Sequence, residues 1–340
     1  MELEIKHRSA AHCENGAIAS LLSFYGINMS EPMIFGLASG LFFSHMPFIK
    51  MSGMPVTSFR TFPGVLFKRI TKLLDIKAKT QRFMSPEKAM TKLDKLLLEK
   101  HTPVGCVVGM YYLPYIPFEY RFHFNGHNIC VIGKDIKTNE YRIIDTNATQ
   151  KVSISYDDLA KVRFAKGGTY PLLGQMYWIE SVPQVIPEFS PIIIKSIRKT
   201  CDNMISYPHF IRFIGTQGIL YMSNRLRNWE KDMGYDKAIL NLAQLIRMLE
   251  EIGTGGAGFR FLYGAFLQES AKLTGMLELN DFSRRITDIG DLWRKFSYIG
   301  SQIIKQRDKL STFDDLANLL SYIGNQETIF FNDLKRYIDD

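Results

Sequence analysis

Cysteine is scarce in this chain of 340 residues, which contains only Cys13, Cys106, Cys130 and Cys201. The four lie far apart, and no C-x-x-C pair occurs among them. This spacing argues against both a disulfide framework and a zinc ribbon. We therefore expect reduced thiols and no structural metal.

Long uninterrupted apolar runs and a secretory signal are also missing. The longest apolar stretch, residues 33–49, is interrupted by Ser39, Ser44, His45 and Pro47, so we expect no transmembrane segment. The start of the chain mixes acidic and basic residues and lacks the apolar centre of a signal peptide. These features predict a cytoplasmic protein.

The charge balance is basic, with a formal net charge of +8 and a pI near 9.1. Such a balance suits nucleic acid, a membrane surface or an acidic protein partner, and charge alone does not choose among them. Because no known nucleic-acid-binding motif occurs, we expect no nucleic-acid partner.

The N-terminal part alternates between helical and strand-like patterns. Helices are expected from Cys13 to Gly26, from Ser30 toward Gly40, and from Ser85 onward. The stretch from residue 43 to 67, rich in Met, Phe and Pro, predicts loop and short pieces packed as core. Four strand-like runs, at 103–110, 127–133, 140–145 and 175–179, predict a small antiparallel sheet.

The C-terminal part reads as almost entirely helical. Three prolines within residues 182–191 mark a boundary, which predicts one domain over residues 1–185 and a second over 186–340. Amphipathic segments near 204–227, 236–251, 258–273, 280–307, 310–323 and 327–338 predict a helical bundle. The fold class is therefore α+β.

One ordered set of residues has the chemistry of a cysteine nucleophile. Cys13 opens a helix, where the helix dipole favours a thiolate, and His127 and Asp145 follow on successive strand-like runs. His127 would act as general base, and Asp145 would orient its imidazole. Each residue alone also has a structural interpretation, as a buried thiol, a strand-end histidine and an Asx turn.

Several segments resemble the butirosin biosynthesis protein H family. The blocks are HRSAAHCENGAIASLLSFYG with the Ser-Glu and Gly-Leu-rich segment after it, then PVGCVVGMYYLPY, FNGHNICVIGKD and YRIIDT, and finally the helical stretch WEKDMGYDKAILNLAQLIRMLEEIGTGGAGFRFLYGAFLQESA. The resemblance implies a papain-like N-terminal domain related to bacteriocin-leader-processing peptidases. It also places the nucleophile, base and acid on Cys13, His127 and Asp145.

The resemblance further implies acyl transfer from a carrier-protein thioester to an acceptor, an amine in the butirosin case. The family often has an acidic residue before its Tyr-Leu-Pro-Tyr block, where this chain has Val108, Gly109 and Met110. If that acid contacts the acceptor amine, the acceptor of this chain differs.

Further residues are candidates for the oxyanion or substrate-binding groups: His7, His12, Glu14, Tyr112 and Arg260. Papain-like sites carry a glutamine donor six positions before the cysteine, and His7 occupies that position here. His12 and Glu14 have alternative interpretations as packing and first-turn residues of the first helix. Arg260 would bind the phosphate of phosphopantetheine or form a structural ion pair.

We therefore predict ping-pong acyl transfer through Cys13 to an amine or hydroxyl of a small-molecule or lipid acceptor, in specialised-metabolite or lipid biosynthesis. The donor would be a phosphopantetheine-linked acyl carrier protein, and no metal or redox cofactor is implied. Carrier proteins are acidic, so basic residues of the helical part, among them Arg284, Arg285, Arg294 and Lys295, would steer their approach. A cysteine hydrolase (thioesterase, amidase or peptidase) and a non-enzymatic binding module remain alternatives, and the oligomeric state stays open.

Overall fold

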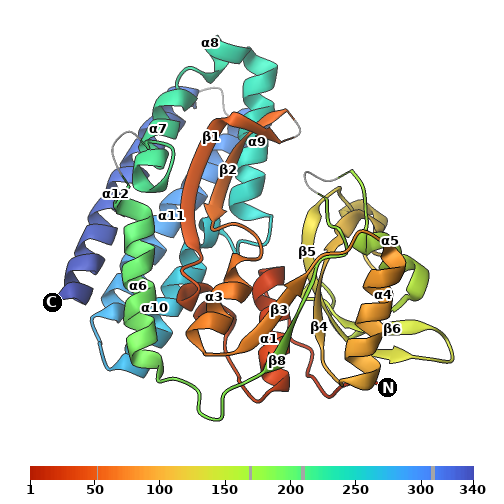
Figure 1. Ribbon diagram of the computed structural model, residues 1–340. Helices are drawn as coiled ribbons and strands as arrows, with labels where there is room; N and C mark the ends of the chain where they lie inside the picture. The colour runs from red at the N-terminus through yellow and green to blue at the C-terminus, as the bar shows by residue number, and fades with distance from the viewer. Residues whose placement is uncertain (52, 168–170, 208–210, 308–310) are drawn as a thin grey trace. The chain divides into compact units, whose positions relative to one another are not determined.

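Two compact units make up the protein in a computed structural model that describes residues 1–51, 53–167, 171–207, 211–307 and 311–340 (Figure 1). The N-terminal unit comprises Met1–Ile34 and Pro63–Pro187, and the C-terminal unit comprises Phe35–Phe62 and Glu188–Asp340. The change at residue 187 lies close to the predicted boundary after residue 185. The assignment of Phe35–Phe62 differs from the predicted division, because this early segment belongs to the C-terminal unit.

The N-terminal unit is built on a six-stranded sheet with the order β3-β8-β4-β5-β6-β7, in which every recorded pairing is antiparallel. Its strands are β3 (Lys77–Gln81), β4 (Val104–Gly109), β5 (Asn125–Asp135), β6 (Glu140–Ile144), β7 (Val152–Ser155) and β8 (Met176–Ser181). The central strands β4 and β5 are almost wholly buried, which agrees with the apolar sequence of β4 and of the middle of β5, whereas the first half of β5 buries polar residues as well. The predicted antiparallel sheet is confirmed.

Helices pack around this sheet, and two of them begin at a serine that caps the helix. They are α1 (Cys13–Phe24), α2 (Glu31–Leu37, which continues into the other unit), α3 (Val65–Leu73), α4 (Pro86–Asp94, followed by a π-helical stretch Lys95–Glu99) and α5 (Tyr156–Arg163). Ser85 caps α4 by accepting the N–H of Lys88, and Ser155 caps α5 by accepting that of Asp158. Helix α1 packs against β4 and β5, which sets Cys13 beside the sheet.

Two strands of this unit were not predicted. Strand β3 has the sequence KAKTQ and is largely exposed at the sheet edge, so it carries no apolar alternation. Strand β7 has only four residues and lies at the opposite edge. An exposed strand such as β3 and a strand as short as β7 give little hydrophobic signal, because too few of their side chains are buried.

The prediction of irregular structure over residues 43–67 is wrong. Strands β1 (Leu41–Met51) and β2 (Met54–Arg60) form an antiparallel hairpin in the C-terminal unit. The pairing register shifts twice along β1, which breaks the period of two that would have marked a strand. Two aromatic residues of the hairpin do form core: the ring of Phe43 lies 5.5 Å from that of Phe59 and 6.2 Å from that of Trp293.

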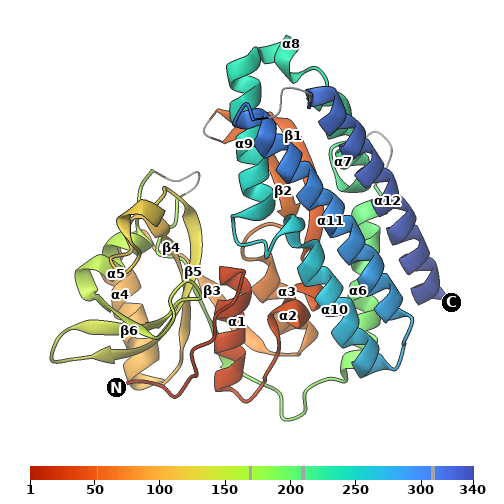
Figure 2. The same ribbon diagram turned by 180° about the vertical axis from the view of Figure 1, so that it is seen from behind.

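The rest of the C-terminal unit is helical, as predicted. Its helices are α6 (Phe189–Ile205), α7 (Gly215–Leu226), α8 (Trp229–Met233), α9 (Tyr235–Glu250), α10 (Arg260–Thr274), α11 (Leu279–Ile304) and α12 (Phe313–Asp339), and α11 packs against α10 and α12 (Figure 2). Helix α6 was missed, and the segments predicted at 310–323 and 327–338 form one helix. Residues 208–210 and residue 310 of the predicted segments lie outside the described residues.

A buried charge pair joins three parts of the C-terminal unit. Arg260 donates from Nε and Nη2 to the two carboxylate oxygens of Glu327, at 2.9 Å each, and from Nη1 to the carbonyl of Gly258 at 2.7 Å. Trp293 donates its indole N–H to Glu327 at 2.7 Å. Arg260 and Glu327 are both fully buried, so the pair is structural.

Acid should weaken the C-terminal unit through His45. This side chain on β1 is 1% exposed, and its Nδ1 lies 2.9 Å from the Thr57 hydroxyl. Burial, with the nearby Arg225 charge, lowers the pKa of His45 from 6.5 to about 4. The neutral ring is thus favoured in the folded state, and stability is lost as the pH falls from 6.5 to about 4.

This loss amounts to about 3 kcal/mol, and we expect His45→Gln to remove it while keeping a bond to Thr57. The measurement is the free energy of unfolding in denaturant at pH 7 and pH 4.5. The exposed His101→Gln is the control. An equal acid-induced loss in wild type and His45→Gln would contradict the assignment.

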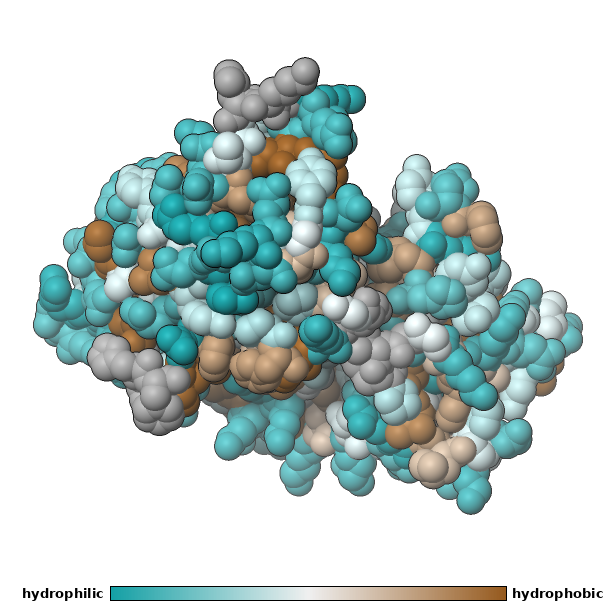
Figure 3. Space-filling model, turned by 90° about the horizontal axis from the view of Figure 1, so that it is seen from above, coloured by the Kyte–Doolittle hydropathy of each residue, from teal (hydrophilic) through white to brown (hydrophobic). Residues whose placement is uncertain are grey.

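One face of the protein shows few concentrated apolar areas. On the face drawn in Figure 3, hydrophilic residues predominate, and hydrophobic ones appear as separate patches. Across the described ranges, no helix is both long enough and apolar enough to span a bilayer.

Candidate functional site

Cys13 is the first residue of α1, and the segment before it is held in place by one carboxylate. Glu31 accepts the backbone N–H of Ala11 at 2.9 Å and that of His12 at 2.6 Å. His12 is the N-cap residue of α1. The Cys13 thiol is therefore presented at the positive end of a twelve-residue helix, where a thiolate is stabilised.

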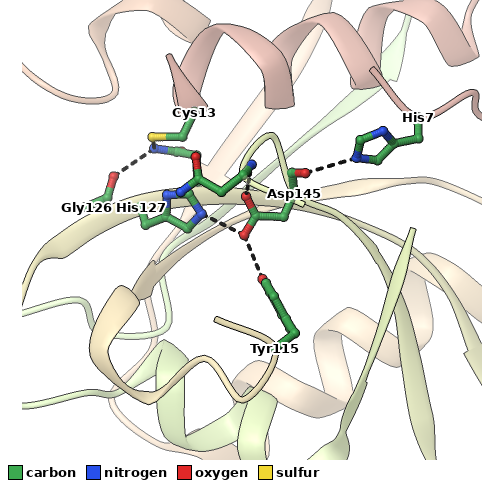
Figure 4. Close-up of polar contacts among 8 residues, drawn as sticks. His7, Cys13, Tyr115, Gly126, His127 and Asp145 are labelled. Atoms are coloured by element: carbon green, nitrogen blue, oxygen red, sulfur yellow. Dashed lines mark hydrogen bonds and ion pairs between the residues drawn. The ribbon is translucent and has the colours of Figure 1, made fainter. Parts of the chain in front are cut away.

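His127 and Asp145 meet across two neighbouring strands. His127 lies on β5, and Asp145 directly follows β6, which pairs with β5. The His127 Nε2 is 2.8 Å from Asp145 Oδ2, and the two residues are 3% and 1% exposed (Figure 4). The two strands thus bring the predicted base and acid together.

The thiol of Cys13 completes this arrangement. Burial lowers the pKa of His127, but the Asp145 carboxylate and the hydrogen-bonded Cys13 sulfur outweigh it, so the pKa of His127 is raised. The pKa of Asp145 is lowered, because the effects of His127, Asn147 and Tyr115 outweigh its burial. With Nε2 facing Asp145, the Nδ1 atom of His127 is the nitrogen left for the thiol.

Tyr115 is a fourth member of the site that was not predicted. Its hydroxyl donates to Asp145 Oδ2 at 2.7 Å, and the backbone N–H of Asn147 donates to Oδ1 at 2.9 Å. Burial and the neighbouring carboxylate raise the pKa of Tyr115, so it remains a donor. The predicted Tyr112 instead has its ring 4.7 Å from the Lys161 ammonium. Both tyrosines belong to the Tyr-Leu-Pro-Tyr block, and its last residue is the one at the site.

Removing the Tyr115 hydroxyl should destabilise the N-terminal unit. A hydrogen bond to a buried carboxylate contributes about 1.5–3 kcal/mol, so Tyr115→Phe should lower the free energy of unfolding by that amount. Tyr112→Phe removes a hydroxyl from the same sequence block and should have almost no effect. Chemical denaturation measures the free energy of unfolding of both variants. An equal decrease in the two would show that the hydrogen bond from Tyr115 to Asp145 does not stabilise the protein.

The remaining predicted residues near the N-terminus have other contacts. His7 donates from Nε2 to the backbone carbonyl of Asp145 at 3.1 Å, so it supports the acid rather than the thiol.

Glu14 is 1% exposed and accepts the N–H of Gly64 at 2.9 Å, so the interpretation as a solvated first-turn acid is wrong. His12 is buried as the cap of α1. Arg260 lies in the C-terminal unit, where Glu327 engages it.

Asn128 was also missed, although it follows His127 directly. Its Nδ2 lies 3.9 Å from the Cys13 sulfur. Successive residues of a strand point to opposite faces of the sheet, so placing His127 at the site predicts that Asn128 points away from it. Within the described ranges, no three His, Cys, Asp or Glu side chains are grouped as a metal site.

Fold and site together define a class of protein: an α+β chain whose N-terminal unit joins a cysteine at the first position of a helix to a buried histidine–aspartate pair. The sequence model of butirosin biosynthesis protein H, N-terminal, matches residues 12–146, an interval that contains Cys13, His127 and Asp145. A second model, a domain of unknown function called DUF4872, matches residues 157–334, more than half of the chain. The chain belongs to the butirosin biosynthesis protein H-like family. No curated protein matches it.

Proposed function

We propose that this protein is a biosynthetic acyltransferase with Cys13 as its nucleophile, working in a papain-like arrangement. The observation that carries the proposal is the buried His127–Asp145 pair at 2.8 Å, with the thiol of Cys13, the first residue of α1, hydrogen-bonded to the same histidine. A cysteine, a base and a group that orients the base are the parts needed for covalent acyl transfer.

In the first half-reaction, His127 takes the proton of the Cys13 thiol, and the thiolate attacks the carbonyl carbon of a thioester. The tetrahedral intermediate collapses with release of the phosphopantetheine thiolate, which takes the proton back from the His127 imidazolium. The acyl group is then held on Cys13 as a new thioester. Asp145 keeps the imidazole oriented and stabilises its positive charge throughout.

In the second half-reaction, an acceptor amine or hydroxyl attacks the acyl-Cys13 carbonyl. His127 accepts the proton that the acceptor loses and delivers it to the departing Cys13 sulfur, so the thiol is restored. The position next to the base matters for the acceptor: Val108 on β4 is the register partner of His127 on β5. Because β4 offers no carboxylate here, it supplies no counter-charge for a cationic acceptor beside His127.

The proposed donor is an acyl carrier protein bearing phosphopantetheine, and the basic excess of the chain supports it. The formal net charge is +8, and acidic carrier proteins associate faster with basic surfaces at low salt. Two of the arginines named above are paired within the protein, Arg284 with Asp281 and Arg285 with Asp333. Because salt screens attraction between charged surfaces, rates of transfer that do not change with salt would count against electrostatic attraction of the carrier protein.

The experiment that tests transfer follows the fate of the acyl group. Wild-type protein is incubated with a panel of acyl-loaded carrier proteins, and the acylated protein is then divided between buffer and buffer containing amine acceptors. Formation of amide faster than release of free acid is the expected result. Free acid alone, at the same rate with and without amine, would identify a hydrolase, and no acylation by any donor would favour a binding module.

A further inference from the structure

The side chain of Asn128 is buried beside the sulfur of Cys13 and held by two other groups. Asn128 is 4% exposed, and its Nδ2 lies 3.9 Å from the Cys13 sulfur and 3.0 Å from the carbonyl oxygen of Gly126. Its Oδ1 accepts the hydroxyl of Tyr177 at 2.9 Å. Every polar atom of this amide therefore has a defined neighbour.

The chemistry of these neighbours fixes which way the amide points. A backbone carbonyl only accepts, so the atom that faces Gly126 must be the nitrogen and the other must be the oxygen. Tyr177 is itself buried, and burial together with the nearby Glu14 and cysteine sulfurs raises the pKa of its hydroxyl. Tyr177 thus remains protonated and keeps donating to Oδ1. One N–H of Asn128 is used by Gly126, and the other is directed toward the sulfur.

We infer that Asn128 is the side-chain donor that stabilises negative charge at Cys13, first on the thiolate and then on the oxyanion of the tetrahedral intermediates. The inference rests on the proposed function, because it assigns a further residue to that reaction. The sequence suggested His7 or His12 as candidates for this role, and the ring of His7 instead donates to the carbonyl of Asp145.

The two roles follow from one position. A thiolate at Cys13 accepts the second N–H of Asn128, while the His127 imidazolium holds the proton. When the sulfur bonds to the carbonyl carbon, the oxygen on that carbon carries the charge next to the same donor. A donor already fixed by Gly126 and Tyr177 does not have to reorganise as the charge moves, which is the condition for effective oxyanion stabilisation. Tyr177 is a positioning residue in this account.

The test uses three variants of the full chain. Tyr177→Phe removes the anchor and keeps the amide. The double variant Asn128→Leu/Tyr177→Phe removes the amide without leaving the phenol lacking its acceptor. Asn128→Asp keeps the size and the acceptor for Tyr177 but exchanges the N–H for a carboxyl oxygen. Unfolding midpoints and circular dichroism verify that each variant is folded.

Two readouts are compared, alkylation of Cys13 by iodoacetamide against pH and the rate of Cys13 acylation by a thioester. In the double variant and in Asn128→Asp, the midpoint of the alkylation profile should rise by about one pH unit, which lowers alkylation below the midpoint about tenfold. Acylation should fall about 10²–10³-fold, as for loss of one oxyanion donor. Tyr177→Phe alone should change both readouts much less.

The outcomes separate this inference from the proposed function. One outcome is that the wild type is acylated and the double variant gives the same two readouts as Tyr177→Phe. This result would overturn the role of Asn128 and would not contradict the proposed acyltransferase. A shifted alkylation midpoint in a protein that no thioester acylates would support the contact with the thiolate and overturn the oxyanion role together with the proposed function.

Discussion

Asp145→Asn should lower the rate of Cys13 acylation by about 10⁴-fold, the effect typical of losing the carboxylate that orients a catalytic histidine. The two carboxylate oxygens face only donors: Oδ1 faces the N–H of Asn147, and Oδ2 faces Tyr115 and His127. An asparagine NH₂ at the position of either oxygen would face a donor, so at least one of these hydrogen bonds would be lost. If the asparagine NH₂ lies beside His127, it donates to Nε2, which must then be unprotonated. The proton of the neutral imidazole is then on Nδ1, so Nδ1 can no longer take the proton of the Cys13 thiol.

Asp135→Asn is the matched control, because Asp135 makes the same type of contact, to the N–H of Lys137, at the exposed last position of β5. Its acylation rate should equal that of wild type. The rates are measured by intact mass after mixing with an acyl thioester. Asp145→Asn acylated as fast as Asp135→Asn would show that the His127–Asp145 bond has no part in catalysis.

Glu327→Ala should destabilise the C-terminal unit by about 3–5 kcal/mol, the cost of leaving a buried charge without its partner. Arg260 would keep only the Gly258 carbonyl, and the aromatic rings of Phe59 and Trp293 near its guanidinium do not replace a carboxylate. The Trp293 indole would lose its acceptor as well. Both donors are fully buried, so water does not replace the lost carboxylate.

A double variant separates the charge from the packing. Arg260→Met/Glu327→Leu removes both charges, and its free energy of unfolding should lie well above that of Glu327→Ala, since an apolar pair of similar size replaces a buried ion pair at little cost. Glu230→Ala, at an exposed position of α8, should have no effect. A Glu327→Ala variant as stable as Glu230→Ala would mean that Arg260 finds solvent or another partner.

The elements that position the site were predictable because their residues carry local signals. Cys13 begins a helix that Gly26 ends, and the apolar strands that bear His127 and precede Asp145 are central in the sheet. The hairpin at Leu41–Arg60 was not predictable, because its register shifts hide the strand pattern and its partners come from the C-terminal half of the sequence. Local patterns do not report such distant packing.

Within the site, the sequence predicted the residues whose side-chain chemistry marks a catalytic role. It did not predict the residues whose role depends only on where the fold places them. Cysteine, histidine and aspartate in this order indicate a nucleophile and its base. Tyr115 and Asn128 are common residues whose role depends on where a turn and a neighbouring strand place one hydroxyl and one amide. His7 shows the reverse error, since its distance from Cys13 along the chain suggested a donor for the oxyanion, and folding directs its ring to Asp145.

Intact mass after incubation with acyl-loaded carrier proteins tests the central claim most directly, with wild type and Cys13→Ala compared side by side. The proposal predicts one acyl adduct per wild-type chain and none on Cys13→Ala, although Cys106, Cys130 and Cys201 are present in both and are buried. Adducts on both proteins would place the acyl group elsewhere. Absence of any adduct on wild type across the donor panel would contradict Cys13 as an acyl-accepting nucleophile.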